Sequence, residues 1–141
     1  MREPPMTQYI VEFPDQPAVH AKLTRMLLKE HVPFKAVVTV RVAGQATIQF
    51  LAPKNNPLRA KLAQAGVQVR EEQVFEVEIP HQPWELHKLA KSLADEDINI
   101  LSLYTNVEGE TMRIVLAVDQ TANAMALVRK LGFFPEFPIG G

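Results

Sequence analysis

The sequence predicts an α+β fold in which a ferredoxin-like split βαβ unit, with element order βαββαβ, is repeated twice. Eight strands with four helices on one face are expected. The first observation is an internal repeat at an offset of 66 residues: 13 of the 60 positions from 8 to 67 are identical in the second copy, without a gap. The second is that strand-like and helix-like patterns alternate in the same order in both copies. The third is that turn residues separate these patterns at corresponding places.

The repeat places one unit at residues 7–72 and the other at 73–137. Its clearest segment is Phe13-Pro14-Asp15-Gln16-Pro17, which returns as Ile79-Pro80-His81-Gln82-Pro83. A unit of about 60 residues is short for a free-standing domain, so we expect the two copies to share a sheet or a core.

A strand and then a helix open each copy. Residues 8–13 and 74–79 are short runs of aromatic and β-branched residues that stop at a proline, which is typical of strands. Pro17 and Pro83 then fall where a first helical turn would begin. Apolar residues follow at helical spacing and predict one buried face per helix, formed by Val19, Leu23, Met26 and Leu27 and by Leu86, Leu89, Ala90 and Leu93.

A hairpin, a helix and a short strand complete each copy. Residues 34–42 meet 45–51 across Ala43-Gly44, and residues 98–107 meet 111–118 across Glu108-Gly109. Helices are predicted over 57–65 and 123–131, each followed by a glycine that suits a left-handed helix end. Residues 67–70, and those around Phe133, are the predicted closing strands. Right-handed crossovers would put both helices on one face of the sheet.

Composition excludes several function classes. The chain has 141 residues, 47% of them hydrophobic, and a net charge of -1, whereas nucleic-acid binders usually carry a basic surplus. The two halves of the chain have opposite net charges. Residues 1–72 hold 10 Lys/Arg and 6 Asp/Glu, which gives +4, and residues 73–141 hold 5 Lys/Arg and 10 Asp/Glu, which gives -5. Opposite charges suit copies that face each other within a chain or between chains, and the alternative is drift of solvated residues. Because even eight strands leave edges that pair, we expect a homodimer or larger assembly.

The remaining negative evidence concerns redox state and location. The chain has no cysteine, so disulfides and thiolate metal sites are excluded. Its first residues have no apolar stretch behind a basic start, and no apolar run approaches membrane length, so a cytoplasmic protein that does not contact a membrane is expected.

The loop after each first strand resembles the opening of the ACT domain. In that family a strand leads into Asp-x-Pro-Gly, a helix, and an Ile-Asn-Ile-like step into the second strand. Copy one has Val11-Glu12-Phe13-Pro14-Asp15-Gln16-Pro17-Ala18, and copy two has Ile79-Pro80-His81-Gln82-Pro83-Trp84 and then Ile98-Asn99-Ile100. The chain is similar to a small stand-alone tandem ACT protein over roughly residues 7–134.

The resemblance implies a non-catalytic regulatory protein that binds a small amino-acid-like ligand between two ACT-like units and acts through association, with a partner enzyme as a further expected partner. The free N–H groups and positive dipole end of a helix start would bind the ligand carboxylate. The residues implied are Asp15, Gln16, Pro17, Ala18 and Val19 from copy one and His81, Gln82, Trp84 and Asn99 from copy two. Asp15 would hold the amino group.

Departures from the pattern predict one site per chain. The family's glycine is Ala18 in copy one and Trp84 in copy two, and its acidic position is His81 in copy two. We therefore expect the intact site at the copy-one loop and expect the Trp84 indole to fill the equivalent pocket of copy two. Two alternatives stay open: Asp15 only caps the helix, or the pockets are degenerate and the chain is a protein–protein interaction module.

Catalytic and metal chemistry have little support in the sequence. Ser92 and Ser102 have no evident histidine partner, and no glycine-rich phosphate loop is present. The loop after the first strand lacks the arginine that acylphosphatases of this plan use, and Tyr104 alone does not supply the aromatic pair of an RNA-recognition domain. The four histidines are scattered, so neither a metal nor a cofactor is expected.

Overall fold

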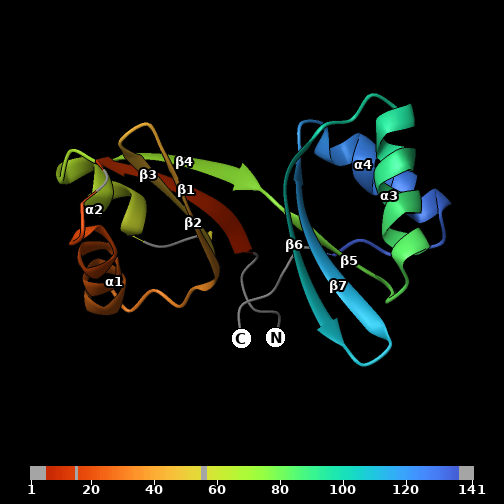
Figure 1. The fold of residues 1–141 in the computed structure, drawn as a ribbon, viewed down its shortest axis with the longest axis horizontal. Helices are drawn as coiled ribbons and strands as arrows, with labels where there is room; N and C mark the ends of the chain where they lie inside the picture. Colours follow the sequence, from red (N-terminus) through yellow and green to blue (C-terminus); the bar gives the residue numbers. More distant parts are fainter. Residues whose placement is uncertain (1–5, 15, 55–56, 137–141) are drawn as a thin grey trace. The chain divides into compact units, whose positions relative to one another are not determined.

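The computed structural model describes residues 6–14, 16–54 and 57–136 of the chain. The chain divides into two compact units, with the boundary between Glu72 and Gln73. Figure 1 shows the helices and strands of both units. The first unit consists of β1 (Met6–Pro14), α1 (Val19–Lys29), β2 (Lys35–Val42), β3 (Gln45–Pro53), α2 (Leu58–Gln64) and β4 (Gln68–Gln73).

The second unit repeats this order up to its last helix. It consists of β5 (Phe75–Pro80), α3 (Pro83–Asp95), β6 (Ile100–Glu108), β7 (Thr111–Val118) and α4 (Thr121–Lys130). Seven strands in two antiparallel sheets and four helices are therefore present in the described residues, and the predicted repeated α+β fold is confirmed.

The strand order of the first sheet is β2-β3-β1-β4, as the split βαβ plan requires. Strand β1 pairs with β3 along its whole length, with Tyr9 opposite Phe50 and Val11 opposite Ile48. These four side chains point to the same face of the sheet and are fully buried. The rings of Tyr9 and Phe50 stack with their centroids 5.6 Å apart. This face carries the core of the unit.

The second sheet has the order β5-β7-β6, and its expected fourth strand around Phe133 is absent from the described residues. A single antiparallel bridge takes its place, in which Glu76 and Glu136 exchange both backbone hydrogen bonds. Phe133 still packs on the core, whereas Phe134 is 84% exposed. Seven of the eight expected strands are therefore present in the described residues.

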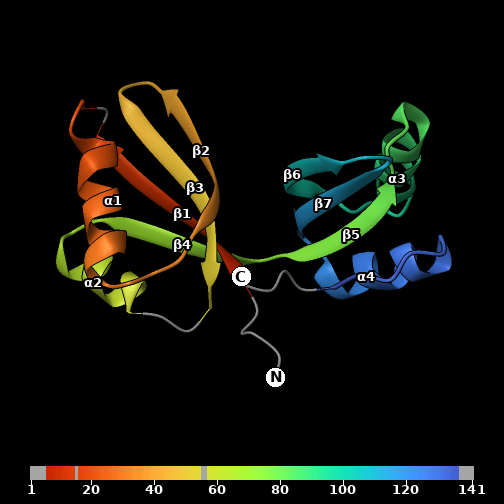
Figure 2. The same cartoon turned by 90° about the horizontal axis from the view of Figure 1, so that it is seen from below.

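Both helices of each unit cover one face of their own sheet, as Figure 2 shows for α1 and α2. The first core combines the buried faces of α1 and α2 with the inward residues of β1 and β3. Its helical members are Val19, Leu23, Leu27, Leu58 and Leu62. The second core has the same plan, with Leu89, Leu93, Ala124 and Val128 from α3 and α4. The apolar stripes of the sequence therefore identified the buried helix faces.

Two local expectations differ from the structure. Pro83 is the first residue of α3 as predicted, but α1 begins at Val19, two residues after Pro17. The β6–β7 turn is formed by Gly109 and Glu110, one residue later than predicted, because Glu108 still pairs with Thr111. This turn corresponds to Ala43-Gly44 at the 66-residue offset, and Gly109 has the positive φ of 62° that a tight hairpin needs.

Candidate functional site

The loop between β1 and α1 leaves the start of α1 uncapped in the described residues. Ala18 is the N-cap residue and has no side chain that could accept a hydrogen bond, and no acidic residue stands in the first turn. The N–H of Val19 donates to the carbonyl of Gln16 at 3.2 Å. The N–H groups of His20 and Ala21 have no acceptor within the described residues. As far as the described residues are concerned, the positive end of α1 is therefore open to an anion.

Of the predicted site residues, Asp15 lies outside the described residues, so its role as ligand contact or helix cap stays a prediction. Gln16, Pro17 and Ala18 are exposed in the loop, and Val19 is buried in the core beneath them. Val19 therefore anchors the loop to the core of the first unit.

A pocket of about 460 Å³ lies beside this loop, on the side where α1 faces the end of α2. Phe13, Val19, Leu23, Met26 and Val67 are its apolar lining residues, and Gln16, Lys22 and Arg25 are polar ones. It is completed by Glu12, Pro14, Ala18, Ala65 and Gly66. Its volume is within the range of small-molecule sites, and an apolar lining with a few polar groups is typical of them.

A second hollow, of about 670 Å³, lies on the other side of the same loop. It is bordered by Gln16 and Pro17 and reaches Thr39 and Arg41 of the edge strand β2. His20 connects the two elements, because its Nε2 lies 2.8 Å from Thr39 Oγ1. This hollow is more polar than the first, and Gln16 and Val19 line both.

The equivalent loop of copy two is arranged differently. Gln82 is the N-cap residue of α3, and Pro83 follows it. Glu85 places a carboxylate in the first turn, where its negative charge offsets the positive end of the helix dipole. The N–H of His81 donates to the carbonyl of Glu110 at 2.8 Å, and that of Gln82 donates to Pro80 at 2.9 Å. The second loop is thus less suited to binding an anion than the first.

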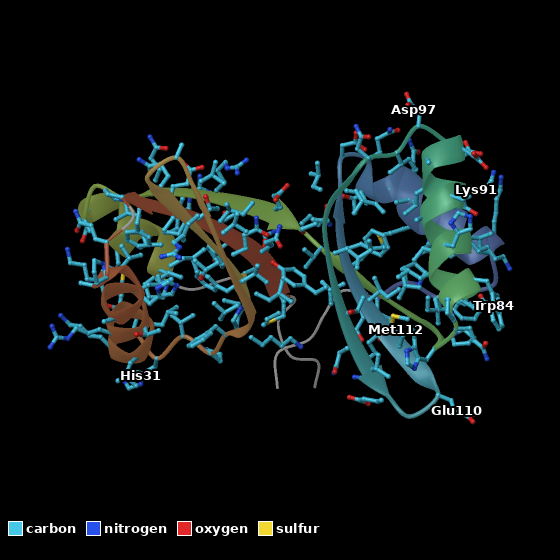
Figure 3. The ribbon with its side chains drawn as sticks, in the orientation of Figure 1. His31, Trp84, Lys91, Asp97, Glu110 and Met112 are labelled. Carbon is cyan, nitrogen blue, oxygen red and sulfur yellow. The ribbon has the colours of Figure 1, made fainter. Side chains whose placement is uncertain are left out.

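Trp84 does not fill a pocket of the second unit, contrary to expectation. The residue is 61% exposed, and Figure 3 shows it pointing outward at the beginning of α3. Position 84 follows Pro83 in the first helical turn, where α3 directs it away from the stripe formed by Leu89 and Leu93. The bulky side chain is therefore a surface feature of this unit.

Asn99 lies in the exposed connection between α3 and β6. Its backbone N–H donates to Asp119 Oδ1 at 3.0 Å, and its carbonyl accepts from the N–H of Asp119 at 3.2 Å. These bonds fasten Asn99 to the start of α4 in the second unit. The predicted pairing of Asn99 with the copy-one loop stays a prediction.

The sequence reasoning missed several residues that line the first pocket, chiefly Lys22, Arg25 and Gly66. A signal for the first two was present, because positions 18, 22 and 25 lie on one side of a helix that starts at the loop. The turn Ala65-Gly66-Val67 follows α2, and only the packing of α2 on the sheet brings it to the pocket.

The described residues contain no group of three or more His, Cys, Asp or Glu side chains that could hold a metal ion. In the same part of the chain no helix is both long enough and apolar enough to cross a membrane.

No model of a protein family matches the sequence, and no curated protein matches it significantly. Solved structures are similar over nearly the whole chain. Protein BT0572 from Bacteroides thetaiotaomicron superimposes with a TM-score of 0.80 at 14% identity, covering 93% of this chain and 91% of that one. The ligand-free regulatory subunit of aspartate kinase from Thermus thermophilus gives 0.66 at 15% identity, covering 92% and 94%.

The regulatory subunit of aspartate kinase from Thermus flavus gives a TM-score of 0.66 at 19% identity, covering 92% of each chain. Identities this low establish the fold alone. The chain has the fold of these regulatory subunits over nearly its whole length, and its resemblance to small tandem ACT-domain proteins is confirmed at the level of the fold.

Proposed function

We propose that this chain is a non-catalytic regulatory protein that binds a small amino-acid-like ligand at the β1–α1 loop of its first unit. The observation that carries the proposal is the 460 Å³ pocket beside that loop, which combines apolar walls with polar groups near the uncapped start of α1. An amino acid has the complementary shape, with an anionic end and an adjoining side chain.

The ligand carboxylate would accept hydrogen bonds from the free N–H groups at the start of α1, where the helix dipole favours negative charge. The ligand side chain would lie against Phe13, Leu23 and Met26. Asp15 is the acid nearest in sequence and is our candidate for the partner of the amino group. Its carboxylate would then make a charge-assisted hydrogen bond to the ligand.

We further propose one ligand site per chain, in the first of two ACT-like units at 7–72 and 73–137. The copy-two loop already has a carboxylate, that of Glu85, at its helix start, and its N–H groups at His81 and Gln82 are bonded within the unit. His81, Gln82, Trp84 and Asn99 would then contribute only as the surface opposite an occupied copy-one loop.

The regulatory part of the proposal is supported by the fold shared with aspartate kinase regulatory subunits. A regulatory protein without chemistry of its own acts by changing association with a partner, and a cytoplasmic enzyme is the partner class we propose. Ligand binding would couple to that association by favouring one arrangement of the units.

A thermal-shift screen with the twenty amino acids tests the ligand proposal. A ligand that binds the folded state stabilises it by about 2.7 kcal/mol at a hundredfold excess over Kd. At least one amino acid should therefore raise the unfolding temperature in a saturable manner. A flat result across all twenty at millimolar concentration would refute the proposal.

Self-association is a second candidate function, and one specific observation favours it. Strand β2 is an edge of the first sheet, and its residues Val38, Val40 and Val42 are exposed on the face away from the helices. An edge strand with an apolar stripe tends to pair with another chain. We propose that β2 supports a homodimer or a contact with the regulated protein.

A further inference from the structure

The first pocket has a positively charged rim that nothing within the described chain neutralises. Lys22 and Arg25 both line it and are exposed on α1. Neither forms an ion pair or a side-chain hydrogen bond within the described residues. Along α1, the positions one turn after them are Met26 and Lys29, so the helix itself offers them no acid.

For Arg25, the sister position in the second unit indicates that this lack is particular to the first unit. Lys91 corresponds to Arg25 at the 66-residue offset, and its Nζ lies 2.9 Å from Asp95 Oδ2. The position corresponding to Asp95 is Lys29 in the first unit. The exchange of an acid for a base removes the partner of Arg25 and adds a further positive charge nearby.

Among the described lining residues Glu12 is the only acid, and it does not compensate these charges. Val11 and Phe13 point into the core on the helix side of the sheet, so strand alternation turns the Glu12 side chain to the other side. Its sister Glu78 lies within ion-pair distance of Arg113 on the corresponding face, at 4.0 Å. Glu12 therefore contributes backbone to the pocket, and within the described residues Lys22 and Arg25 stay without an acidic partner.

We propose that the ligand carries a second acid group, which Lys22 and Arg25 bind, and that it belongs to the acidic amino acids. This inference rests on the proposed function, because it concerns the side chain of the ligand proposed for the same pocket. The guanidinium of Arg25 can bind a carboxylate through two parallel hydrogen bonds, and the Lys22 ammonium adds a point charge. A neutral amino acid would leave both cations without a partner.

Calorimetry with the whole chain tests this, using the isosteric pairs glutamate and glutamine, and aspartate and asparagine. The acidic member of at least one pair should bind about tenfold or more tighter, the size of one charge-assisted contact. In a Lys22→Gln, Arg25→Gln double variant the ratio within that pair should fall to about one, because the acidic member loses its two charge partners. The preference should also weaken at high salt because both cations are exposed.

The Lys88→Gln, Lys91→Gln double variant removes the sister residues of the second unit and is the matched control, so it should retain the wild-type preference. Equal affinity for acidic and neutral members, or a preference that survives in the Lys22/Arg25 variant, would overturn the inference and leave the proposed function standing. Absence of binding by every amino acid would overturn both.

Discussion

His31 and Asp97, which lie 66 residues apart, have the same left-handed backbone conformation directly after α1 and α3, with φ angles of 53° and 59°. Each donates its N–H to the carbonyl three residues earlier, Leu28 or Ala94, and the next residue donates to the carbonyl five residues before it. This is the Schellman arrangement, in which glycine is usual because a Cβ is strained there. In Figure 3 both side chains point away from the protein.

His31→Gly should therefore stabilise the chain, by about 0.5–1 kcal/mol, because it relieves the left-handed strain and removes no side-chain contact. The gain in stability from Asp97→Gly should be smaller, because the short aspartate side chain tolerates the left-handed conformation better than histidine does. Urea unfolding measures the free energy of unfolding of both variants.

Gly66→Ala is the control, for which a loss of stability is expected. Gly66 has a φ of 75° and nothing within 4 Å of an added Cβ, so its expected loss of about 1 kcal/mol is purely conformational. A destabilising His31→Gly would contradict the argument.

Ala18→Trp transfers the copy-two residue to the copy-one loop and should remove ligand binding. The indole would stand in a pocket that Ala18 now lines, and overfilling of such a space costs about 1–3 kcal/mol. The ligand-induced thermal shift is the measurement. Trp84→Ala, the reciprocal change at an exposed position, should leave the shift intact. The reverse pattern would place the ligand at the second unit.

Asp15→Ala should weaken ligand binding by about 1.5–3 kcal/mol if the carboxylate meets the ligand amino group. Calorimetry with an identified ligand gives the affinity, and urea unfolding without ligand separates the alternative role. If Asp15 only caps α1, the variant loses about 1 kcal/mol of stability while its intrinsic affinity for the ligand is unchanged.

Val40→Lys should convert a self-associated protein to monomers. Val40 is 47% exposed on the edge strand β2, and a charge there is a common protection against edge pairing. Light scattering at several protein concentrations measures the mass. Thr105→Lys alters an exposed position on the corresponding strand β6 and serves as the control. A wild-type chain that is monomeric at high concentration would refute the proposed association.

The pocket illustrates why part of the site could not be predicted from the sequence. Gln16 and Ala18 were identified because a strand, a proline and a helix start are adjacent in the chain. The turn around Gly66 is about 50 residues away, and its position depends on how Leu58 and Leu62 of α2 pack into the core. The lack of an acid one turn after Arg25 is, by contrast, visible in the sequence, because that position is Lys29.

The order of helices and strands, their buried faces and the repeat itself were determined by the sequence, because apolar periodicity and turn residues act over a few neighbouring positions. Pairing between distant segments was decided only in the tertiary structure. Within the described residues a single bridge replaces the eighth strand that the repeat predicts, and the Trp84 ring lies in solvent although its copy-one counterpart lines a pocket. Such outcomes depend on the backbone donors and free space that the folded neighbours provide, which no local pattern records.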